Sequence, residues 1–237
     1  MNNLCILTVL RSSKNNLFDY KYVRRAYNTL KVNISYDFQF CCLTDMLDNV
    51  PDYVTPIPLK YDWPGWWSKI ELFRPHLFEP GTPLLYFDLD EMVLGNIDEM
   101  VELAMSEQFE FMTLRGFNPR ALLRGDIPAS GIMAWKAECD WANKIFNEFT
   151  KNPKKAMARP FDISGQQGDQ GFIGDVLGWK EIPKFQDYLS PRFTCGKRSM
   201  NKCTDIFPKV KIASWSGNPR LHLSDIPWVK KWWEMYG

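Results

Sequence analysis

Short apolar runs alternate along this chain with segments in which apolar residues recur at helical spacing, and this alternation constrains the fold most. The runs typical of strands cover Leu4–Leu10, 37–45, 82–90, 109–116, 130–136 and 209–215. Helical spacing or composition covers 20–30, 66–75, 96–104, 140–152 and 168–179. A chain that alternates strands with helices builds a sheet covered by helices on both faces. The sequence therefore predicts an α/β fold, and nothing in it marks a linker, so we expect a single domain over residues 1–237.

Acidic residues follow two of the predicted strands at the point where each strand ends. Asp45 comes after one strand, and Asp88, Asp90 and Glu91 come after the apolar run 83–87. Ligands of open α/β sheets bind outside the carboxyl ends of the strands. On extended backbone, Asp88 and Asp90 would point the same way and could share one Mn²⁺ or Mg²⁺ ion. A solvated turn is the alternative interpretation of these carboxylates.

Composition narrows the class of protein. Hydrophobic residues make up 45% of the 237 residues, which is ample for a core. The chain has 29 Lys and Arg residues and 28 Asp and Glu residues, so it is close to neutral. This balance argues against a protein whose main function is to bind a long polyanion. No apolar run approaches the roughly 18 residues that span a bilayer, and the N-terminus resembles a first strand rather than a signal peptide. We expect a soluble, cytoplasmic protein with no transmembrane segment.

The cysteines and histidines do not favour a zinc site. The chain has six cysteines but two histidines, and no C-x-x-C pair occurs. Several of the cysteines lie within apolar strand-like runs, which is typical of buried free thiols. We predict free thiols at Cys5, Cys41, Cys42, Cys139, Cys195 and Cys203.

Four segments together resemble a known family. "LLYFDLDEMVLGNIDEM" is similar to the D-x-D segment of GT-A fold glycosyltransferases, in particular family 8 and its bacterial and phage relatives. "WPGWWSKIELFRPHLF", "GDQGFI" and "SWSGNPRLH" match further blocks of that family in the same order. The resemblance extends over nearly the whole chain. It implies a GT-A (Rossmann-like) fold with a mixed, mostly parallel sheet, and an enzyme that uses a nucleoside diphosphate sugar.

The resemblance assigns roles to individual residues. Asp88 and Asp90 match the D-x-D motif, which implies that both bind Mn²⁺ or Mg²⁺ and that Asp88 also reaches the donor ribose. Lys69 matches a basic residue that contacts the donor, with an exposed helix lysine as the alternative. Asp169 and Gln170 match a catalytic pair that faces the donor sugar. A helix N-cap is the ordinary alternative role for Asp169.

The segment "SWSGNPRLH" departs from the family pattern. Ser214 stands where family 8 usually has a histidine metal ligand, so the resemblance leaves His222 as the candidate third ligand. A packed, hydrogen-bonded histidine is the alternative for His222. Arg220 stands where relatives have lysine and would bind the diphosphate. Gly217 would let backbone N–H groups approach a phosphate closely.

Position alone suggests further donor contacts near the N-terminus. Thr8 and Arg11 end the first predicted strand, where this fold receives the nucleotide base and ribose. Trp63, Trp66 and Trp67 form a cluster that could bind a sugar face, although we favour packing as their role.

The resemblance therefore implies a glycosyltransferase that moves a sugar from a nucleoside diphosphate donor, a UDP-sugar in particular, to an acceptor hydroxyl with retention. The relatives point to a saccharide, a glycolipid or a hydroxymethylated DNA base as the acceptor, and the basic segment "KNPKKAMAR" could touch DNA phosphates. A catalytically impaired nucleotide-sugar or carbohydrate-binding relative is the alternative. A nucleotidyltransferase is disfavoured, because "LTVLRSSKNN" lacks the glycine-rich loop of that class.

Overall fold

A computed structural model describes residues 4–13, 18–48, 50–117, 123, 127–158, 168–200 and 210–237. Its strands are β1 (Leu4–Leu10), β2 (Phe38–Thr44), β3 (Thr55–Pro58), β4 (Pro83–Phe87), β5 (Glu91–Val93), β6 (Phe111–Arg115), β7 (Pro128–Lys136), β8 (Thr194–Gly196) and β9 (Ile212–Ser214). Its α-helices are α1 (Tyr20–Asn33), α2 (Asp98–Met105), α4 (Asp140–Lys151), α5 (Pro153–Met157), α6 (Gly168–Leu177), α7 (Lys197–Met200) and α8 (Pro227–Met235). Short 3₁₀ helices are η1 (Gly65–Phe73), η2 (Phe185–Asp187) and η4 (Leu221–Leu223).

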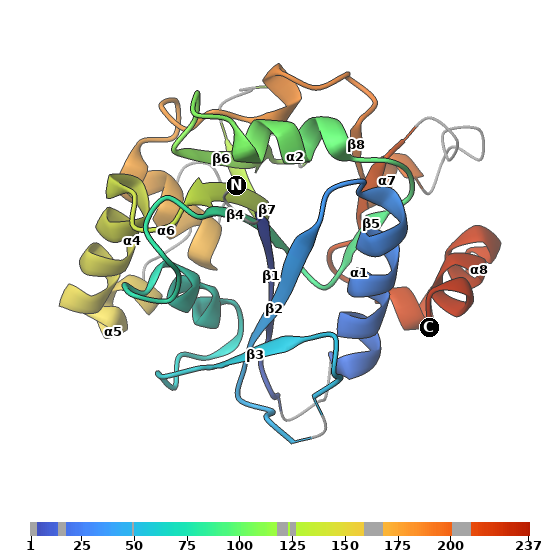
Figure 1. Ribbon diagram of the computed structural model, residues 1–237, viewed down its shortest axis with the longest axis horizontal. Coiled ribbons are helices and arrows are strands. Elements are labelled where there is room, and N and C mark those ends of the chain that lie inside the picture. Colours follow the sequence, from blue (N-terminus) through green and yellow to red (C-terminus); the bar gives the residue numbers. More distant parts are fainter. Residues whose placement is uncertain are drawn as a thin grey trace.

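The large sheet has the strand order β3-β2-β1-β4-β7-β6. Strand β1 pairs in parallel with β2 and β4, and β3 pairs in parallel with β2. Strand β7 runs antiparallel to β4 and β6, so the sheet is mixed and mostly parallel. A small second sheet has the order β5-β9-β8, and its outer strands β5 and β8 are labelled in Figure 1. The predicted α/β class is confirmed, whereas one domain over residues 1–237 stays a prediction.

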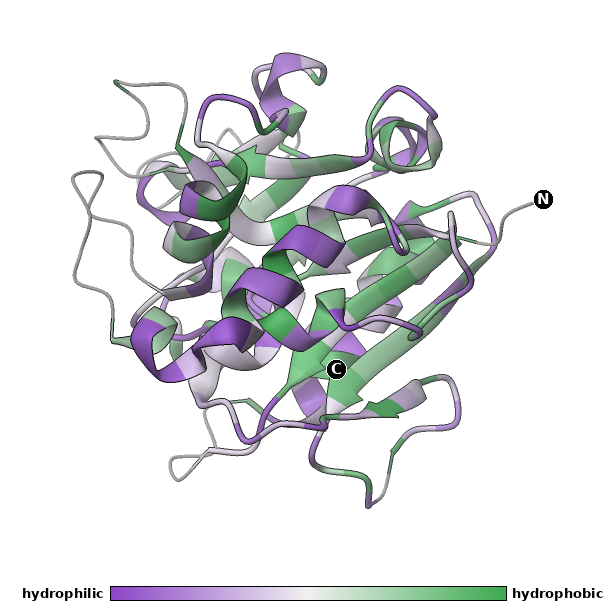
Figure 2. Ribbon diagram, turned by 90° about the vertical axis from the view of Figure 1, so that its left-hand side faces the viewer, coloured by the Kyte–Doolittle hydropathy of each residue, from purple (hydrophilic) through white to green (hydrophobic). Residues whose placement is uncertain are grey.

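Two hydrophobic cores lie on opposite faces of the large sheet, because successive side chains of a strand point to opposite faces. On β1, Ile6 joins the core that contains Val23 of α1, while Leu7 joins the core that contains Ile70 of η1. Helices α4 and α6 also contribute to this second core. In Figure 2 the strands are mainly hydrophobic and the helices carry both hydrophilic and hydrophobic residues. Helices therefore cover both faces of the sheet, as predicted.

Strand β2 is buried on both faces from Phe40 to Thr44. Cys41 and Cys42 are both fully buried, and they belong to opposite cores. The reason is that β2 lies between β1 and β3 in a sheet covered on both faces. Free thiols are confirmed at Cys5, Cys41, Cys42, Cys139 and Cys195, while Cys203 lies outside the described residues.

The segment after β4 differs from the predicted strand, which was expected to continue to Asp90. Strand β4 ends at Phe87, and the backbone N–H of Glu91 donates to the carbonyl of Asp88 at 3.1 Å. This turn carries the chain from the large sheet into β5 of the small sheet. Asp88 and Asp90 therefore lie on a turn and not on extended backbone, and the expected extended geometry is wrong.

Two further helices differ from the sequence pattern. The predicted helix 66–75 is a 3₁₀ helix, η1, which ends before Pro75. Helix α8 was not predicted; it buries Val229 and Trp232 against the core. Of the helices that the structure describes, none is both long enough and apolar enough to cross a membrane.

Candidate active site

Two cavities lie side by side beyond the carboxyl ends of β1 and β4, and both are lined by Asp88, Asp90 and Gln170. The first cavity has a volume of about 610 Å³, and its other lining residues include Arg11, Phe18, Trp66, Lys69, Asp169 and Arg220. The second cavity has a volume of about 570 Å³, and its other lining residues include Glu91, Phe117, Lys197, Arg198, Ser214 and Gly217. Most of the predicted site residues, but not Thr8 or His222, thus gather where an open α/β sheet binds ligands.

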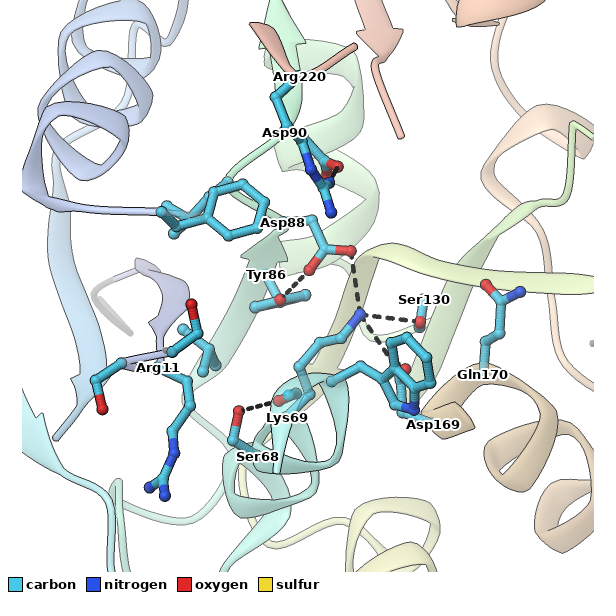
Figure 3. Close-up of a pocket in the computed structure, with 17 residues that line it drawn as sticks. Arg11, Ser68, Lys69, Tyr86, Asp88, Asp90, Ser130, Asp169, Gln170 and Arg220 are labelled. Carbon is cyan, nitrogen blue, oxygen red and sulfur yellow. Dashed lines mark hydrogen bonds and ion pairs between the residues drawn. The ribbon is translucent and has the colours of Figure 1, made fainter. Parts of the chain in front are cut away.

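Lys69 lies between Asp88, Ser130 and Asp169 in the first cavity (Figure 3). Its side chain extends from η1, and its Nζ lies 3.0 Å from Oδ2 of Asp88, 3.0 Å from Oδ2 of Asp169 and 3.2 Å from Oγ of Ser130. Lys69 is only 7% exposed, so the alternative of an exposed helix lysine is wrong. Burial opposes its charge, but Asp169 and Asp88 raise the pKa of Lys69 above its ordinary value. A protonated lysine therefore connects elements η1, β4 and α6.

Asp169 lies in the first turn of α6, and its side chain forms an ion pair with Lys69. It is not the residue before the helix, so the ordinary N-cap role does not describe it. Burial raises the pKa of Asp169, and Lys69 opposes that shift. Gln170, the next residue, lines both cavities and so lies between them.

Asp90 and Arg220 form a second ion pair at the boundary of the cavities. Nη1 of Arg220 lies 3.2 Å from Oδ2 of Asp90, and its guanidinium lies 5.0 Å from the ring centroid of Phe18. Burial and the neighbouring Asp88 raise the pKa of Asp90 to about 6. Gly217 precedes Arg220 in the same loop and has a φ of +79°, a conformation that favours glycine.

Glu91 adds a third carboxylate to the same turn. It is buried, and its Oε2 accepts a hydrogen bond of 2.7 Å from Oγ of Ser214. Burial and Asp90 raise the pKa of Glu91 well above its ordinary value. A Cβ at position 131 would lie 2.4 Å from Oε1 of Glu91, so Gly131 on β7 makes the room for this side chain.

Trp66 lies apart from the other tryptophans of its cluster. Trp63 and Trp67 are buried in the core, as the packing interpretation predicts, whereas Trp66 is 54% exposed and lines the first cavity. A Cβ at position 168 would lie 2.4 Å from Nε1 of Trp66. Gly168, with a φ of +68°, therefore lets the start of α6 pass directly against the indole.

Thr8 and Arg11 differ in their relation to the cavity. Thr8 is fully buried within β1, and it lines neither of the two cavities, whereas its neighbour Val9 lines the first. The structure thus does not bring Thr8 to the site. Arg11 lines the first cavity, and its guanidinium forms ion pairs with Asp45 and Asp62.

His222 does not join the aspartates. Its Nδ1 lies 2.5 Å from the hydroxyl of Tyr22, and its ring contacts those of Tyr22 and Trp233. Over the described part of the chain, no three His, Cys, Asp or Glu side chains are grouped so that they could hold a metal ion. The expected set of Asp88, Asp90 and His222 is therefore not assembled, and the ligand role of His222 stays a prediction.

Comparisons with known proteins identify the fold. No family model and no curated protein matches the sequence. The solved structure of the galactosyltransferase LgtC with donor and acceptor sugar analogues matches with a TM-score of 0.62 at 13% identity, over 98% of this chain and 95% of that one. The glycosyltransferase GlyE of Streptococcus pneumoniae matches with a TM-score of 0.61 at 11% identity; this chain is covered fully and spans 60% of GlyE. Mouse xyloside xylosyltransferase 1 matches with a TM-score of 0.54 at 16% identity, over 92% of this chain and 98% of that one.

The fold is that of the GT-A glycosyltransferases. Membership of family 8 stays a prediction.

Within this GT-A fold, the carboxylates fit a hard divalent cation in chemistry and in charge. Asp88 and Asp90 supply oxygen ligands, which Mg²⁺ and Mn²⁺ prefer. Four acidic side chains lie here, Asp88, Asp90, Glu91 and Asp169, and among the described residues only Lys69 and Arg220 form ion pairs with them. Burial, and after it the neighbouring carboxylates, raise the pKa values of Asp90 and Glu91, and an additional cation would oppose these shifts.

Sequence reasoning missed several side chains of this GT-A site. Tyr86 donates a hydrogen bond to Oδ1 of Asp88, and Ser130 contacts Lys69 from β7. Glu91 was visible as the third carboxylate of its segment, but its burial beside Ser214 was not. Lys197 and Arg198 reach the second cavity from a part of the chain that carries no recognised motif. Three strand pairings, β4 with β7, β5 with β9 and β8 with β9, bring these residues together.

Proposed function

We propose that this protein is a glycosyltransferase that moves a sugar from a nucleoside diphosphate donor, a UDP-sugar in particular, to an acceptor hydroxyl. The proposal rests mainly on one observation: Lys69 lines the first cavity and forms ion pairs with both Asp88 and Asp169. The proposed acceptor is a saccharide, a glycolipid or a hydroxymethylated DNA base. The GT-A fold supports the reaction class, and the geometry supports the roles below.

The donor would occupy the first cavity, whose volume of about 610 Å³ suits a nucleotide sugar. Arg11 lies on one side of Lys69 in Figure 3, where the nucleoside would lie, and Asp169 and Gln170 lie on the other, where the sugar would lie. Arg220 at the boundary would donate charge-assisted hydrogen bonds to the diphosphate. The donor's anomeric carbon would then lie near Gln170, which both cavities share.

Asp88 and Asp90 would hold Mn²⁺ or Mg²⁺. When bound, the ion would neutralise charge that develops on the diphosphate as it leaves. The ion pair of Lys69 with Asp88 fixes the orientation of that carboxylate, and Arg220 does the same for Asp90. Side chains fixed in this way need no reorganisation during the reaction, which is the basis of electrostatic catalysis.

In the proposed transfer, the anomeric C–O bond breaks and its electron pair goes to the diphosphate. The acceptor oxygen forms the new bond to the anomeric carbon, and the acceptor proton passes to a diphosphate oxygen. The products are a glycoside and a nucleoside diphosphate. Attack from the side on which the diphosphate leaves gives retention and requires no separate base. Asp169, paired with Lys69, would bind sugar hydroxyls, and Gln170 would lie beside the anomeric carbon.

Thermal unfolding with a panel of nucleoside diphosphate sugars, with and without Mn²⁺, tests the proposal. A ligand that binds only the native state raises the melting temperature. We expect one nucleotide to raise it only with Mn²⁺, and Asp90→Asn to abolish the shift. Asp52→Asn, an exposed aspartate outside both cavities, is the matched control.

Donor hydrolysis then separates the remaining functions. Mn²⁺-dependent release of the nucleoside diphosphate supports an active transferase. Binding of the donor without any hydrolysis or transfer would favour the binding relative instead. If no nucleotide sugar shifts the melting temperature with any metal, the proposed function is wrong.

A further inference from the structure

The second cavity contains two cations that differ from those of the first. In the first cavity each cationic lining residue has a carboxylate partner: Arg11 with Asp45, Lys69 with Asp88 and Arg220 with Asp90. Lys197 and Arg198 line the second cavity, and neither forms an ion pair with any residue that the structure describes. Their positive charge is therefore available to a ligand.

Lys197 is held in place although no carboxylate of the described residues forms an ion pair with it. Its Nζ donates to the carbonyl of Pro219 at 2.7 Å and lies 5.1 Å from the ring centroid of Trp215. An ammonium group has three donors, so two remain for a ligand. Burial and the nearby Arg220 lower the pKa of Lys197, and Asp90 opposes that shift. A bound anion would oppose it further. A cation fixed in this way is preorganised to bind an anion.

We propose that the second cavity binds the acceptor, and that the acceptor is a saccharide bearing a phosphate or carboxylate group that Lys197 and Arg198 bind. This inference rests on the proposed function. Asp88, Asp90 and Gln170 belong to both cavities, so a saccharide in the second lies directly beside a donor sugar in the first. The transferred bond forms between a hydroxyl oxygen of this saccharide and the anomeric carbon, as described above.

The charges of the second cavity also orient the acceptor. Its acidic lining residues, Asp88, Asp90 and Glu91, would repel an anion. The anionic group therefore belongs at the part lined by Lys197 and Arg198, and the accepting hydroxyl at the part lined by Gln170. A volume of about 570 Å³ suits a mono- or disaccharide. A net charge of +1 offers little to a long polyanion, so we favour an acidic saccharide over DNA.

Ligand-observed NMR titrations with UDP and Mn²⁺ present test the inference. The probes are glucose, glucose 1-phosphate and glucuronate, and the proteins are wild type, Lys197→Met and Arg198→Gln. Arg192→Gln removes an exposed charge from the same part of the chain outside both cavities and is the matched control. We expect both anionic probes to bind at least tenfold more tightly than glucose. Each cavity variant should weaken their binding fivefold or more and leave glucose and UDP unaffected.

Several outcomes would overturn the inference. Equal binding of glucose and the anionic probes, or no binding of either anionic probe, contradicts an anionic acceptor. Weaker UDP binding by Lys197→Met would assign that lysine to the donor diphosphate. Arg198 is exposed, so Arg198→Gln decides the matter if Lys197→Met fails to fold. Tighter binding of an oligonucleotide with hydroxymethylcytosine than of either acidic sugar would replace the saccharide with DNA.

Two comparisons complete the test. A lipid-linked glucosyl diphosphate that binds more tightly than glucose 1-phosphate identifies a lipid carrier as the source of the phosphate, and equal binding identifies a free acidic sugar.

The titrations repeated without UDP separate the two proposals. Anion binding that depends on Lys197 and Arg198, in a protein that binds no nucleotide, would leave the anion site standing and contradict the glycosyltransferase function. A protein that hydrolyses its donor without preferring anionic probes would contradict only the inference.

Discussion

The two cavities are built differently although they share Asp88, Asp90 and Gln170. The first is a network of buried, paired charges in which Lys69 joins Asp88 and Asp169. The second is bordered by Lys197 and Arg198, which have no acidic partner among the described residues. The difference indicates that the cations of the first cavity are already paired before any ligand binds, whereas Lys197 and Arg198 can pair with a ligand. Mutations in the two should therefore affect stability and binding in different proportions.

Lys69→Met should have the largest effect, because it breaks the network of the first cavity. Removing one partner of a buried ion pair leaves uncompensated buried charge, and typically costs about 3 to 5 kcal/mol. We expect the free energy of unfolding in urea to fall by that amount and donor hydrolysis to be lost. Lys144→Met, on the exposed face of α4, is the control. A loss below about 1 kcal/mol would contradict the comparison between the cavities.

Asp90→Asn should separate stability from function. The amide keeps an acceptor for Arg220 and removes repulsion from Asp88, so we expect stability without metal to remain within about 1 kcal/mol of wild type. Mn²⁺-dependent donor hydrolysis should fall by about a hundredfold, since the charge that holds the ion is lost. Urea unfolding and a hydrolysis assay check the two parts. Unchanged hydrolysis would remove Asp90 from the site.

Gly168→Ala should disturb the first cavity through its backbone. A residue other than glycine at a φ of +68° costs about 1 to 2 kcal/mol, and the new Cβ would lie 2.4 Å from Nε1 of Trp66. We expect lower stability and weaker donor binding, measured by urea unfolding and by titration with the donor. Gly81→Ala has a similar φ of +80° and open space around it, so it should share the loss of stability but not of binding.

His222→Ala should have the smallest effect on metal dependence. Its Nδ1 faces the hydroxyl of Tyr22 and not the aspartates, so we expect the Mn²⁺ concentration for half-maximal donor binding to change less than threefold. The measurement is donor binding across a series of Mn²⁺ concentrations. A change of tenfold or more would instead support His222 as a metal ligand, and would show that its loop closes towards Asp90 when the donor binds. Tyr22→Phe, which releases the histidine, would then strengthen Mn²⁺ binding.

The sequence predicted the first cavity better than the second. Lys69, Asp88, Asp90, Asp169 and Gln170 were each identified within short recognisable motifs, and the structure brings them together. Thr8 was identified from its position in the chain alone, and it is buried within β1. Whether a residue at the end of a strand faces a cavity or the core depends on one residue of register.

The sequence by itself determined the α/β class and the position of the acidic residues at the edge of the sheet. Both follow from local patterns, namely apolar runs that alternate with helical spacing and charges that avoid the interior. Only the tertiary structure decided that Asp88 to Glu91 form a turn, that Glu91 is buried beside Ser214, and that Lys197 lines the second cavity. These features depend on the pairing of β9, residues 212–214, with β5, residues 91–93, and with β8, residues 194–196, which no local pattern specifies.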